Sequence, residues 1–149
     1  MNPHWMEQGA KWLVSGSLIV GLTGCSRSEE TAWEKSEKKT ISGKIRISQD
    51  LQEKVSPTDV IFIMAKGESG PPLAVKKVTA TDLPLEYTLS EDDMMLPGMI
   101  FPEKVYVSAR IDKDGNASPP QPGDMEGQAK NNPVPVGATA VDLEINKMY

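Results

Sequence analysis

Short segments in which apolar and polar residues alternate recur after residue 40, and this period of two constrains the fold more than any other feature of the chain. The alternation runs through residues 41–47, 83–89 and 105–110. Successive side chains of a strand point to opposite faces of a sheet, so the pattern predicts strands that are half buried. Residues 59–66 are apolar except at their two ends, which predicts a central strand buried on both faces.

The segments between these strands carry turn signals and short helix signals. Further strands are expected at residues 73–78 and 138–147, and Ser48 and Ser90 are suited to cap single helical turns. Twelve glycines and twelve prolines favour turns between strands. Six or seven strands without a long helix predict an all-β fold, a Greek-key β-sandwich of about seven strands with short helical turns over residues 40–149.

The beginning of the chain has the pattern of a lipoprotein signal. An apolar run at residues 12–22 is too short for a helix that spans a bilayer of about 30 Å. It suits the apolar region of a secretory signal. The run ends in Leu-Thr-Gly-Cys at residues 22–25, which is the order of residues in a bacterial lipobox. We therefore expect residues 1–24 to be a signal peptide and Cys25 to carry fatty acyl chains.

The expected lipid on Cys25 predicts where the rest of the chain resides. Several acyl chains on one residue anchor a protein stably at a membrane. Ser26 follows the Cys, and by the sorting rule of enteric-type bacteria this residue favours the outer membrane. Residues 25–39 are polar and mixed in charge, which predicts a flexible tether. The sequence thus predicts a lipoprotein of the bacterial envelope that faces the periplasm; either Met1 or Met6 is its start.

The rare residues of the chain exclude several classes of chemistry. The only His is His4 and the only Cys is Cys25, so the body lacks an imidazole base for a Ser or Cys nucleophile. It also lacks the Cys and His ligands typical of zinc and blue-copper sites. We expect a protein that is not an enzyme and holds no cofactor or metal ion. The net charge of −5 argues against binding of nucleic acid.

Two segments of the body go beyond a general β pattern. Residues 107–127 contain Ala-Arg, Gly-Asn-Ala and then Pro-Gln-Pro-Gly-Asp, and residues 81–99 contain Asp-Leu-Pro and Glu-Asp-Asp-Met-Met. Together with the strand at 59–66 and the Gly-Pro-Pro turn after it, they resemble the C-terminal periplasmic domain of the CycH-type c-type cytochrome biogenesis proteins. These proteins hold apocytochrome for haem ligation. The resemblance spans roughly residues 40–148 and implies an immunoglobulin-like β-sandwich.

The chain departs from the pattern of that family in three respects. An extra Pro precedes the Pro-Gln-Pro-Gly-Asp run, the family's membrane helices and tetratricopeptide repeats are missing, and a lipid anchor stands in their place. In the family the repeats grip the apocytochrome and the β-domain assists. The resemblance therefore implies a protein-binding module accessory to c-type cytochrome biogenesis, with apocytochrome c or the maturation complex as partner. A structural or adhesion role in the envelope and a Met-based copper or small-ligand binder remain alternatives.

The segment from Gly115 to Gly137 is the first candidate for partner binding. It is rich in Pro and Gly and poor in large apolar residues, and a connection of about 20 residues is unusual in a compact domain. We hypothesise that it forms a recognition surface with Arg110, Gln121, Asp124 and Glu126. The alternative is a long crossover in which Asp124 caps a turn.

Met94, Met95 and Met99 are the second candidate. Thioether side chains fill irregular gaps in a core, and they also suit adaptable contact surfaces. We interpret the three residues as core or as contacts for a partner, including a haem protein. Thioethers are also soft ligands that suit Cu(I), but such a site would have to rely on Met alone.

Overall fold

The computed structural model describes residues 39–116 and 119–149. The predicted signal peptide, Cys25, Ser26 and the tether up to residue 38 lie outside the described residues, so the expectations for them stay predictions. Among the residues that are described, no helix is long and apolar enough to cross a membrane.

Eight strands and two short helical turns make up the described part of the chain. The strands are β1 (Ile41–Ile47), β2 (Val60–Lys66), β3 (Pro72–Thr79), β4 (Leu85–Leu89), β5 (Lys104–Asp112), β6 (Met125–Ala129), β7 (Val134–Pro135) and β8 (Leu143–Met148). The helical turns are α1 (Gln49–Gln52) and the 3-10 turn η1 (Glu91–Asp93). The predicted all-β class with short helical turns is confirmed.

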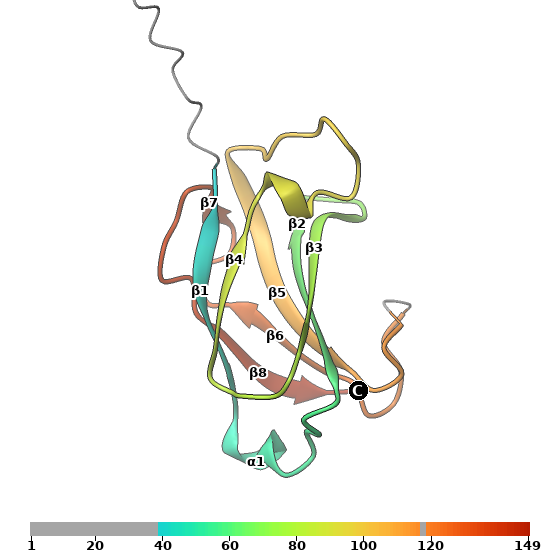
Figure 1. The fold of residues 1–149 in the computed structure, drawn as a ribbon. Coiled ribbons are helices and arrows are strands. Elements are labelled where there is room, and N and C mark those ends of the chain that lie inside the picture. Colours follow the sequence, from blue (N-terminus) through green and yellow to red (C-terminus); the bar gives the residue numbers. More distant parts are fainter. Residues whose placement is uncertain (1–38, 117–118) are drawn as a thin grey trace, which may run out of the picture. The chain divides into compact units, whose positions relative to one another are not determined.

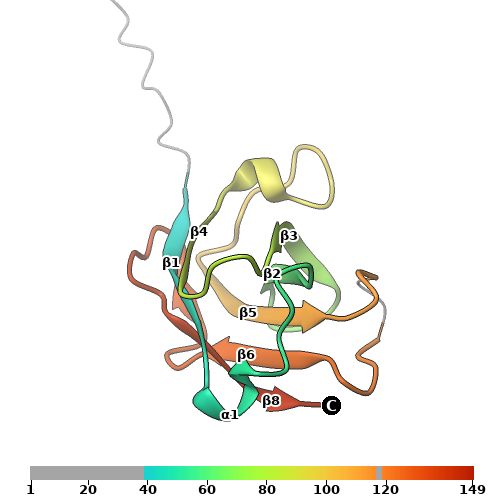
Figure 2. The same ribbon diagram turned by 60° about the horizontal axis from the view of Figure 1, so that its bottom comes forward.

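The strands form one continuous hydrogen-bonded sheet in the order β3-β2-β5-β6-β8-β1-β4, and β7 pairs with the first residues of β5. Neighbouring strands are antiparallel except β1 and β8, which are parallel. The sheet curls on itself (Figure 1, Figure 2). Its two edge strands approach each other where Lys76 of β3 donates a hydrogen bond of 2.8 Å to the Thr88 carbonyl of β4. The result is a sandwich-like β-domain, as the immunoglobulin-like class requires.

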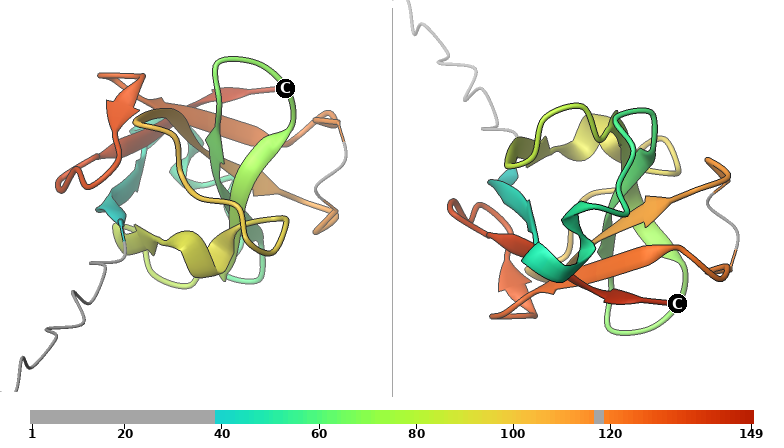
Figure 3. Two further views of the ribbon diagram at one scale, coloured as in Figure 1. Left: turned by 90° about the horizontal axis from the view of Figure 1, so that it is seen from above. Right: turned by 90° about the horizontal axis from the view of Figure 1, so that it is seen from below.

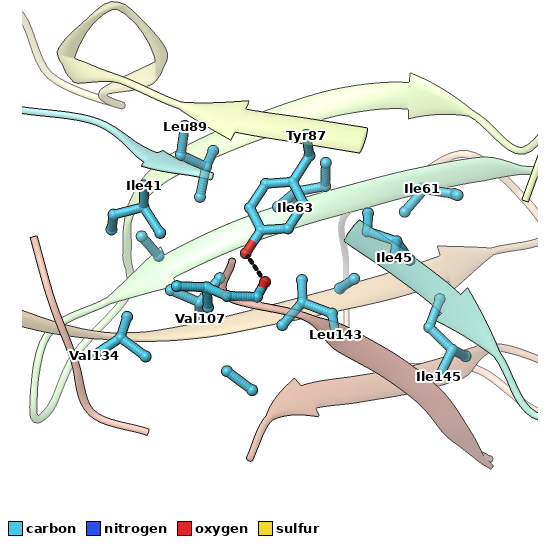
Figure 4. Packing of buried hydrophobic residues seen from close by; sticks show 14 of the residues in the cluster. Ile41, Ile45, Ile61, Ile63, Tyr87, Leu89, Val107, Val134, Leu143 and Ile145 are labelled. Carbon is cyan, nitrogen blue, oxygen red and sulfur yellow. Dashed lines mark hydrogen bonds between the residues drawn. The ribbon is translucent and has the colours of Figure 1, made fainter. Parts of the chain in front are cut away.

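The hydrophobic core fills the inside of the curled sheet. Alternate residues of β1, β4, β5 and β8 point into it, together with the inner residues of β2 (Figure 4). The Tyr87 hydroxyl lies in this core and donates a hydrogen bond of 2.7 Å to the Val141 carbonyl. Burial raises the pKa of Tyr87, and the charge of Asp142 adds to the rise. Tyr87 is therefore a neutral donor that ties β4 to the segment before β8.

Several individual strand predictions agree with the structure. Five consecutive residues of β2, Ile61 to Ala65, are buried, as expected for a strand covered on both faces. Pro84 precedes the edge strand β4, where the lack of an N–H group does not interrupt a ladder.

The strand predicted at residues 138–147 begins only at Leu143. Ala140 has a φ of 59°, which breaks the extended conformation before β8. The chain passes very close to β1 here, since a Cβ atom added to Gly43 would lie 2.0 Å from the Val141 carbonyl oxygen. The prediction of a continuous strand was wrong because it could not include this close crossing.

The segment from Gly115 to Gly137 is not one long connection, because it contains β6 and β7. Gly127 lets β6 approach β8 closely: an added Cβ would lie 2.1 Å from the Glu144 carbonyl oxygen. The Asn132 amide then continues the pairing of β5, accepting a hydrogen bond of 2.8 Å from the Val107 N–H and donating one of 3.0 Å to the Val107 carbonyl. The segment is thus a built part of the sheet.

Candidate functional site

The most exposed large apolar side chains of the described residues gather between η1 and β5. Met95 is 60% exposed, Leu96 61% and Ile100 75%, and Met99 is also exposed. We call residues 95–100 the apolar loop. Scattered exposed apolar residues are common on proteins, but a contiguous group marks a contact surface.

Both ends of the apolar loop are fixed to the domain. At η1 the Asp93 carboxylate accepts a hydrogen bond of 2.9 Å from the Ser90 N–H, which completes a capping box. The Met95 N–H donates a hydrogen bond of 2.8 Å to the Leu73 carbonyl of β3. Phe101, at the other end, is only 3% exposed. The exposure of the side chains between these points is therefore set by a fixed backbone.

The loop at the opposite end of β5 has the reverse character. We call residues 112–124 the capped turn, of which residues 117 and 118 are not described. Asp124 is buried, and its carboxylate accepts hydrogen bonds from the backbone N–H groups of Lys113 (3.1 Å) and Gln121 (2.7 Å). The Asp124 carbonyl accepts a further bond from the Tyr149 N–H. Asp124 therefore holds the turn and the C-terminal residue together.

Two neighbouring carboxyl groups of the capped turn interact closely. Asp112 is buried, accepts a hydrogen bond from the Asn116 N–H, and lies 3.4 Å from the Arg110 guanidinium. Burial raises the pKa of Asp112, and the hydrogen bond that it shares with Asp114 adds to the rise. The same hydrogen bond lowers the pKa of Asp114. Asp112 is therefore the member of the pair that retains a proton more readily.

The side chain of Lys113 connects the capped turn to the turn before β2. The Lys113 ammonium pairs with the Asp59 carboxylate and donates to the Lys54 carbonyl. Asp59 in turn accepts a hydrogen bond of 2.8 Å from the Ser56 N–H. These contacts join two turns that are distant in sequence, so their polar groups serve the fold.

One row of side chains crosses the outer face of five strands. The strand register places Lys77, Phe62, Arg110, Glu126 and Lys147 opposite one another in that order. The Lys77 ammonium lies 5.7 Å from the centre of the Phe62 ring, a cation–π distance. The Phe62 ring thus lies between two basic side chains, and the charges of the last three residues alternate in sign; such cross-strand pairs stabilise a sheet.

A groove lies beside the start of β8. We call it the β8 groove; its volume is about 590 Å³ and it is lined by the end of β6, residues 130–131, β7, residues 138–144 and Arg46. A second groove of about 580 Å³ over β1 and β4 shares Arg46, Ala140 and Asp142 with it. The two grooves therefore flank one ridge of backbone around Ala140.

The walls of the β8 groove carry charges of both signs. Lys130 pairs with Glu144 at 3.6 Å and Arg46 pairs with Asp142 at 3.8 Å. Both pairs are largely exposed, and exposed ion pairs contribute little to stability. They can therefore exchange partners with a bound molecule at little cost to the fold.

The structure separates the residues predicted for partner binding. Arg110 and Asp124 are buried, so they can influence a partner only by shaping the surface above them. Gln121 is exposed, and Glu126 is half-buried and bonded to the Tyr149 hydroxyl. These four residues lie on β5, β6 and the capped turn, and the structure does not test a role in binding for any of them.

The methionine candidates lie at the other end of β5. Met94 packs against the core and bridges to Ala74, whereas Met95 and Met99 belong to the apolar loop. The pattern of three methionines could not tell which of them would face water. Within the described residues, no group of three or more His, Cys, Asp and Glu side chains is arranged to hold a metal ion.

The β8 groove is the feature that the sequence did not indicate directly. Its wall at residues 138–142 was expected to be strand. The segment from Gly115 to Gly137, which we hypothesised to form a recognition surface, contributes to this groove. Its residues Lys130, Val134 and Pro135 line the groove.

Comparison with known proteins identifies the type of domain. The family model of the cytochrome c-type biogenesis protein H Ig-like domain matches residues 41–146. This range begins at the first residue of β1 and ends within β8, so it covers nearly the whole described fold.

Two individual proteins are similar to this chain. The cytochrome c-type biogenesis protein CycH of Pseudomonas aeruginosa is 40% identical over 83 residues, which cover 52% of this chain and 20% of the relative. The chain thus spans only 20% of the length of that relative. Among solved structures, an alternative pilotin from the type II secretion system of Vibrio cholerae matches with a TM-score of 0.48 and 15% identity, over 76% of this chain and 99% of that chain.

Proposed function

Because the chain belongs to the family of the cytochrome c-type biogenesis protein H Ig-like domain, we propose that it assists c-type cytochrome biogenesis by binding a polypeptide. In this proposal it is a lipoprotein of the bacterial envelope, held at the membrane through Cys25 and facing the periplasm. It performs no chemistry of its own and needs no cofactor. Its partner is an apocytochrome c or a protein of the maturation complex.

One observation carries this proposal: the family match extends over nearly the whole described fold rather than over one short motif. The name of the relative from Pseudomonas aeruginosa refers to biogenesis of c-type cytochromes. Since this chain spans 20% of that relative, the proposal transfers a binding role for the domain and not every activity of the larger protein.

The proposed location depends on the lipobox. Leu22-Thr23-Gly24-Cys25 supports acylation of the only Cys, and Ser26 supports transfer to the outer membrane. The residues between Cys25 and β1 supply the predicted tether.

The β8 groove is the surface that best suits a polypeptide. It is open, its lining includes the apolar residues Val134, Ala138 and Val141, and it also carries both signs of charge. An extended peptide presents alternating side chains and backbone polar groups, and a mixed groove of this kind can contact both. Apocytochromes and other unfolded segments offer such a peptide.

A bulky substitution in the groove tests the proposal. Thr139 is exposed and lines the β8 groove, so Thr139→Arg should fill part of it without disturbing the core. The matched control is Thr81→Arg, the same change at an exposed Thr in the connection between β3 and β4. We expect Thr139→Arg to weaken binding of an unfolded apocytochrome c to the purified full chain at least tenfold, and Thr81→Arg to change it less than twofold.

The cellular arm of the experiment uses a strain without the gene. Its content of c-type cytochromes, measured by haem staining after electrophoresis, should fall. The wild-type chain and the Thr81→Arg variant should restore it, whereas the Thr139→Arg variant should not. An unchanged cytochrome content in the deletion strain would overturn the proposed function. Equal restoration by both variants would instead exclude the β8 groove as the contact surface.

A further inference from the structure

We propose that the apolar loop, residues 95–100, inserts into the headgroup region of the bilayer in which the chain is anchored. This inference rests on the acylated Cys25 of the proposed function. It adds a second membrane contact, made by the folded domain itself, and so gives the domain a fixed orientation. Met95 and Met99, which the sequence suggests as partner contacts, then contact lipid.

The shape of the loop presents its apolar side chains outward. The Met99 N–H donates a hydrogen bond of 3.3 Å to the Leu96 carbonyl, across Pro97 and Gly98. Gly98 has a φ of 81°, which suits the third position of a type II turn with Pro before it. This turn forms the tip of the loop. Leu96 and Ile100, at or near its ends, are 61% and 75% exposed.

The loop lies at the end of the domain where the chain arrives from the predicted anchor. Leu89, the last residue of β4 and two residues before η1, pairs with Ile41, the first residue of β1. The Gly137 N–H donates to the Thr40 carbonyl, and the Val136 N–H donates to the carbonyl of Glu103 after the loop. Figure 1 shows the loop and the start of β1 at the same end, and Figure 3 shows that end from above on its left side. A bilayer near residue 39 therefore faces the apolar loop.

The predicted tether keeps that face close to the bilayer. Fourteen peptide steps separate Cys25 from residue 39. A flexible chain of that length has an end-to-end distance of about 20 Å, and even when fully extended it reaches only about 50 Å. The loop thus stays at a high local concentration at the membrane surface, so weak insertion suffices to orient the domain.

Charge selects the kind of lipid surface. Residues 94–102 carry no charge, but Glu91, Asp92 and Asp93 of η1 precede them and Glu103 and Lys104 follow. Lys76 pairs with Asp93 at 3.5 Å, so four acidic groups and two basic groups surround the base of the loop and acidic charge prevails there. Carboxylates at the base of the loop would come near the headgroups upon insertion, and anionic lipids would repel them. The loop therefore suits a zwitterionic surface, such as one of phosphatidylethanolamine and phosphatidylcholine, better than a surface rich in phosphatidylglycerol.

A single fluorophore tests the insertion. Since Cys25 is the only Cys and is acylated in the proposal, a Cys introduced by Leu96→Cys is the only free thiol of the full lipidated chain. We label it with a nitrobenzoxadiazole dye and reconstitute the protein in zwitterionic vesicles. The emission should shift to the blue and be quenched by spin labels on the lipid acyl chains. Vesicles with half phosphatidylglycerol should reduce both effects at least twofold at low salt.

The matched control places the same dye at Glu53→Cys, an exposed position after α1 at the other end of the domain. Its emission should stay that of a dye in water. If the Leu96→Cys dye also stays in water while the protein floats with the vesicles, the insertion is wrong but the anchor stands. If the dye shifts only after an apocytochrome is added, the loop binds protein and the inference is overturned.

The anchor is tested separately, so that the two failures can be told apart. The Cys25→Ser chain should float with vesicles at least tenfold less than the acylated chain. If acylation is absent from the wild-type chain, the proposed anchor fails, and the inference fails with it. A Leu96→Ser, Ile100→Ser chain that keeps its acyl groups should still float with vesicles. Its domain should nevertheless rotate as fast as a domain that the tether alone holds at the membrane, because the loop no longer inserts.

Discussion

The two ends of β5 lead into loops that are stabilised in opposite ways. Before β5, the apolar loop holds its backbone through Met95 and Phe101 but leaves large apolar side chains in water. After β5, the capped turn buries the carboxylates of Asp112 and Asp124: Asp124 accepts hydrogen bonds from two backbone N–H groups, and Asp112 accepts one and lies 3.4 Å from the Arg110 guanidinium. The buried polar groups of the capped turn interact with groups of the same chain, whereas the apolar loop leaves apolar surface that a second molecule could cover.

The difference shows where this domain is adapted to contact and where it is adapted to stay folded. Buried polar groups are costly when they lose a hydrogen bond, so the capped turn is a structural device. Exposed apolar groups cost solvation free energy that association can recover. Substitutions that remove these properties at one end or the other therefore test the comparison.

The largest expected effect is at Asp124. Asp124→Ala removes the acceptor of two backbone N–H groups in a buried site. We expect the free energy of unfolding to fall by about 2–3 kcal/mol, because two hydrogen bonds to a buried carboxylate are lost and bonds to charged groups are among the stronger ones. Urea denaturation followed by circular dichroism measures it. Asp82→Ala, at an exposed carboxylate, is the control and should change stability by less than about 0.5 kcal/mol. Equal stabilities would mean that Asp124 does not hold the turn.

A smaller effect is expected at Asp112, and it depends on pH. Burial raises the pKa of Asp112 above the ordinary value of 3.8, so the folded protein binds this proton more tightly than the unfolded chain does. The favourable contribution of Asp112 is present at pH values below 3.8 and is lost as the pH rises through the folded-state pKa. Asp112→Asn cannot ionise, so the stability of the variant relative to wild type should increase as the pH is raised from 3 to 7.

The measurement for Asp112 is a series of urea denaturation curves at several pH values. Asn keeps an oxygen that can accept the hydrogen bond from the Asn116 N–H, so the turn itself is preserved. Asp82→Asn is the control, and its difference from wild type should remain flat over the same range. A relative stability of Asp112→Asn that decreases with pH would contradict the inferred direction of the shift.

Much of the fold follows from local pattern, because alternation of apolar residues depends only on which face of a sheet is buried. This explains why β1, β2 and β5 were predictable. The strand β6 was missed because Met-Glu-Gly-Gln-Ala has little strand propensity. Its Gly127 is required by the close approach of β8, a contact between residues distant in sequence. Such contacts leave no periodic signal.

The candidate surfaces were predictable only in part. The residue types of the apolar loop are equally compatible with a core, and only the fixed positions of Met94 and Phe101 decide which side chains remain outside. The β8 groove depends on the turn at Ala140, whose positive φ is not typical of Ala. The acylation of Cys25, by contrast, is predicted by a short contiguous motif and stays a prediction here.

The smallest expected effect is in the apolar loop itself. Leu96→Ser and Ile100→Ser together should change the free energy of unfolding in water by less than about 0.5 kcal/mol, because both side chains are already mostly hydrated in the folded state. Met94→Ser is the matched control; this neighbouring side chain packs against the core, so its loss should cost about 1 kcal/mol or more. If the double variant costs as much as the control, the loop side chains pack on the domain in solution, and the contrast between the two ends of β5 disappears.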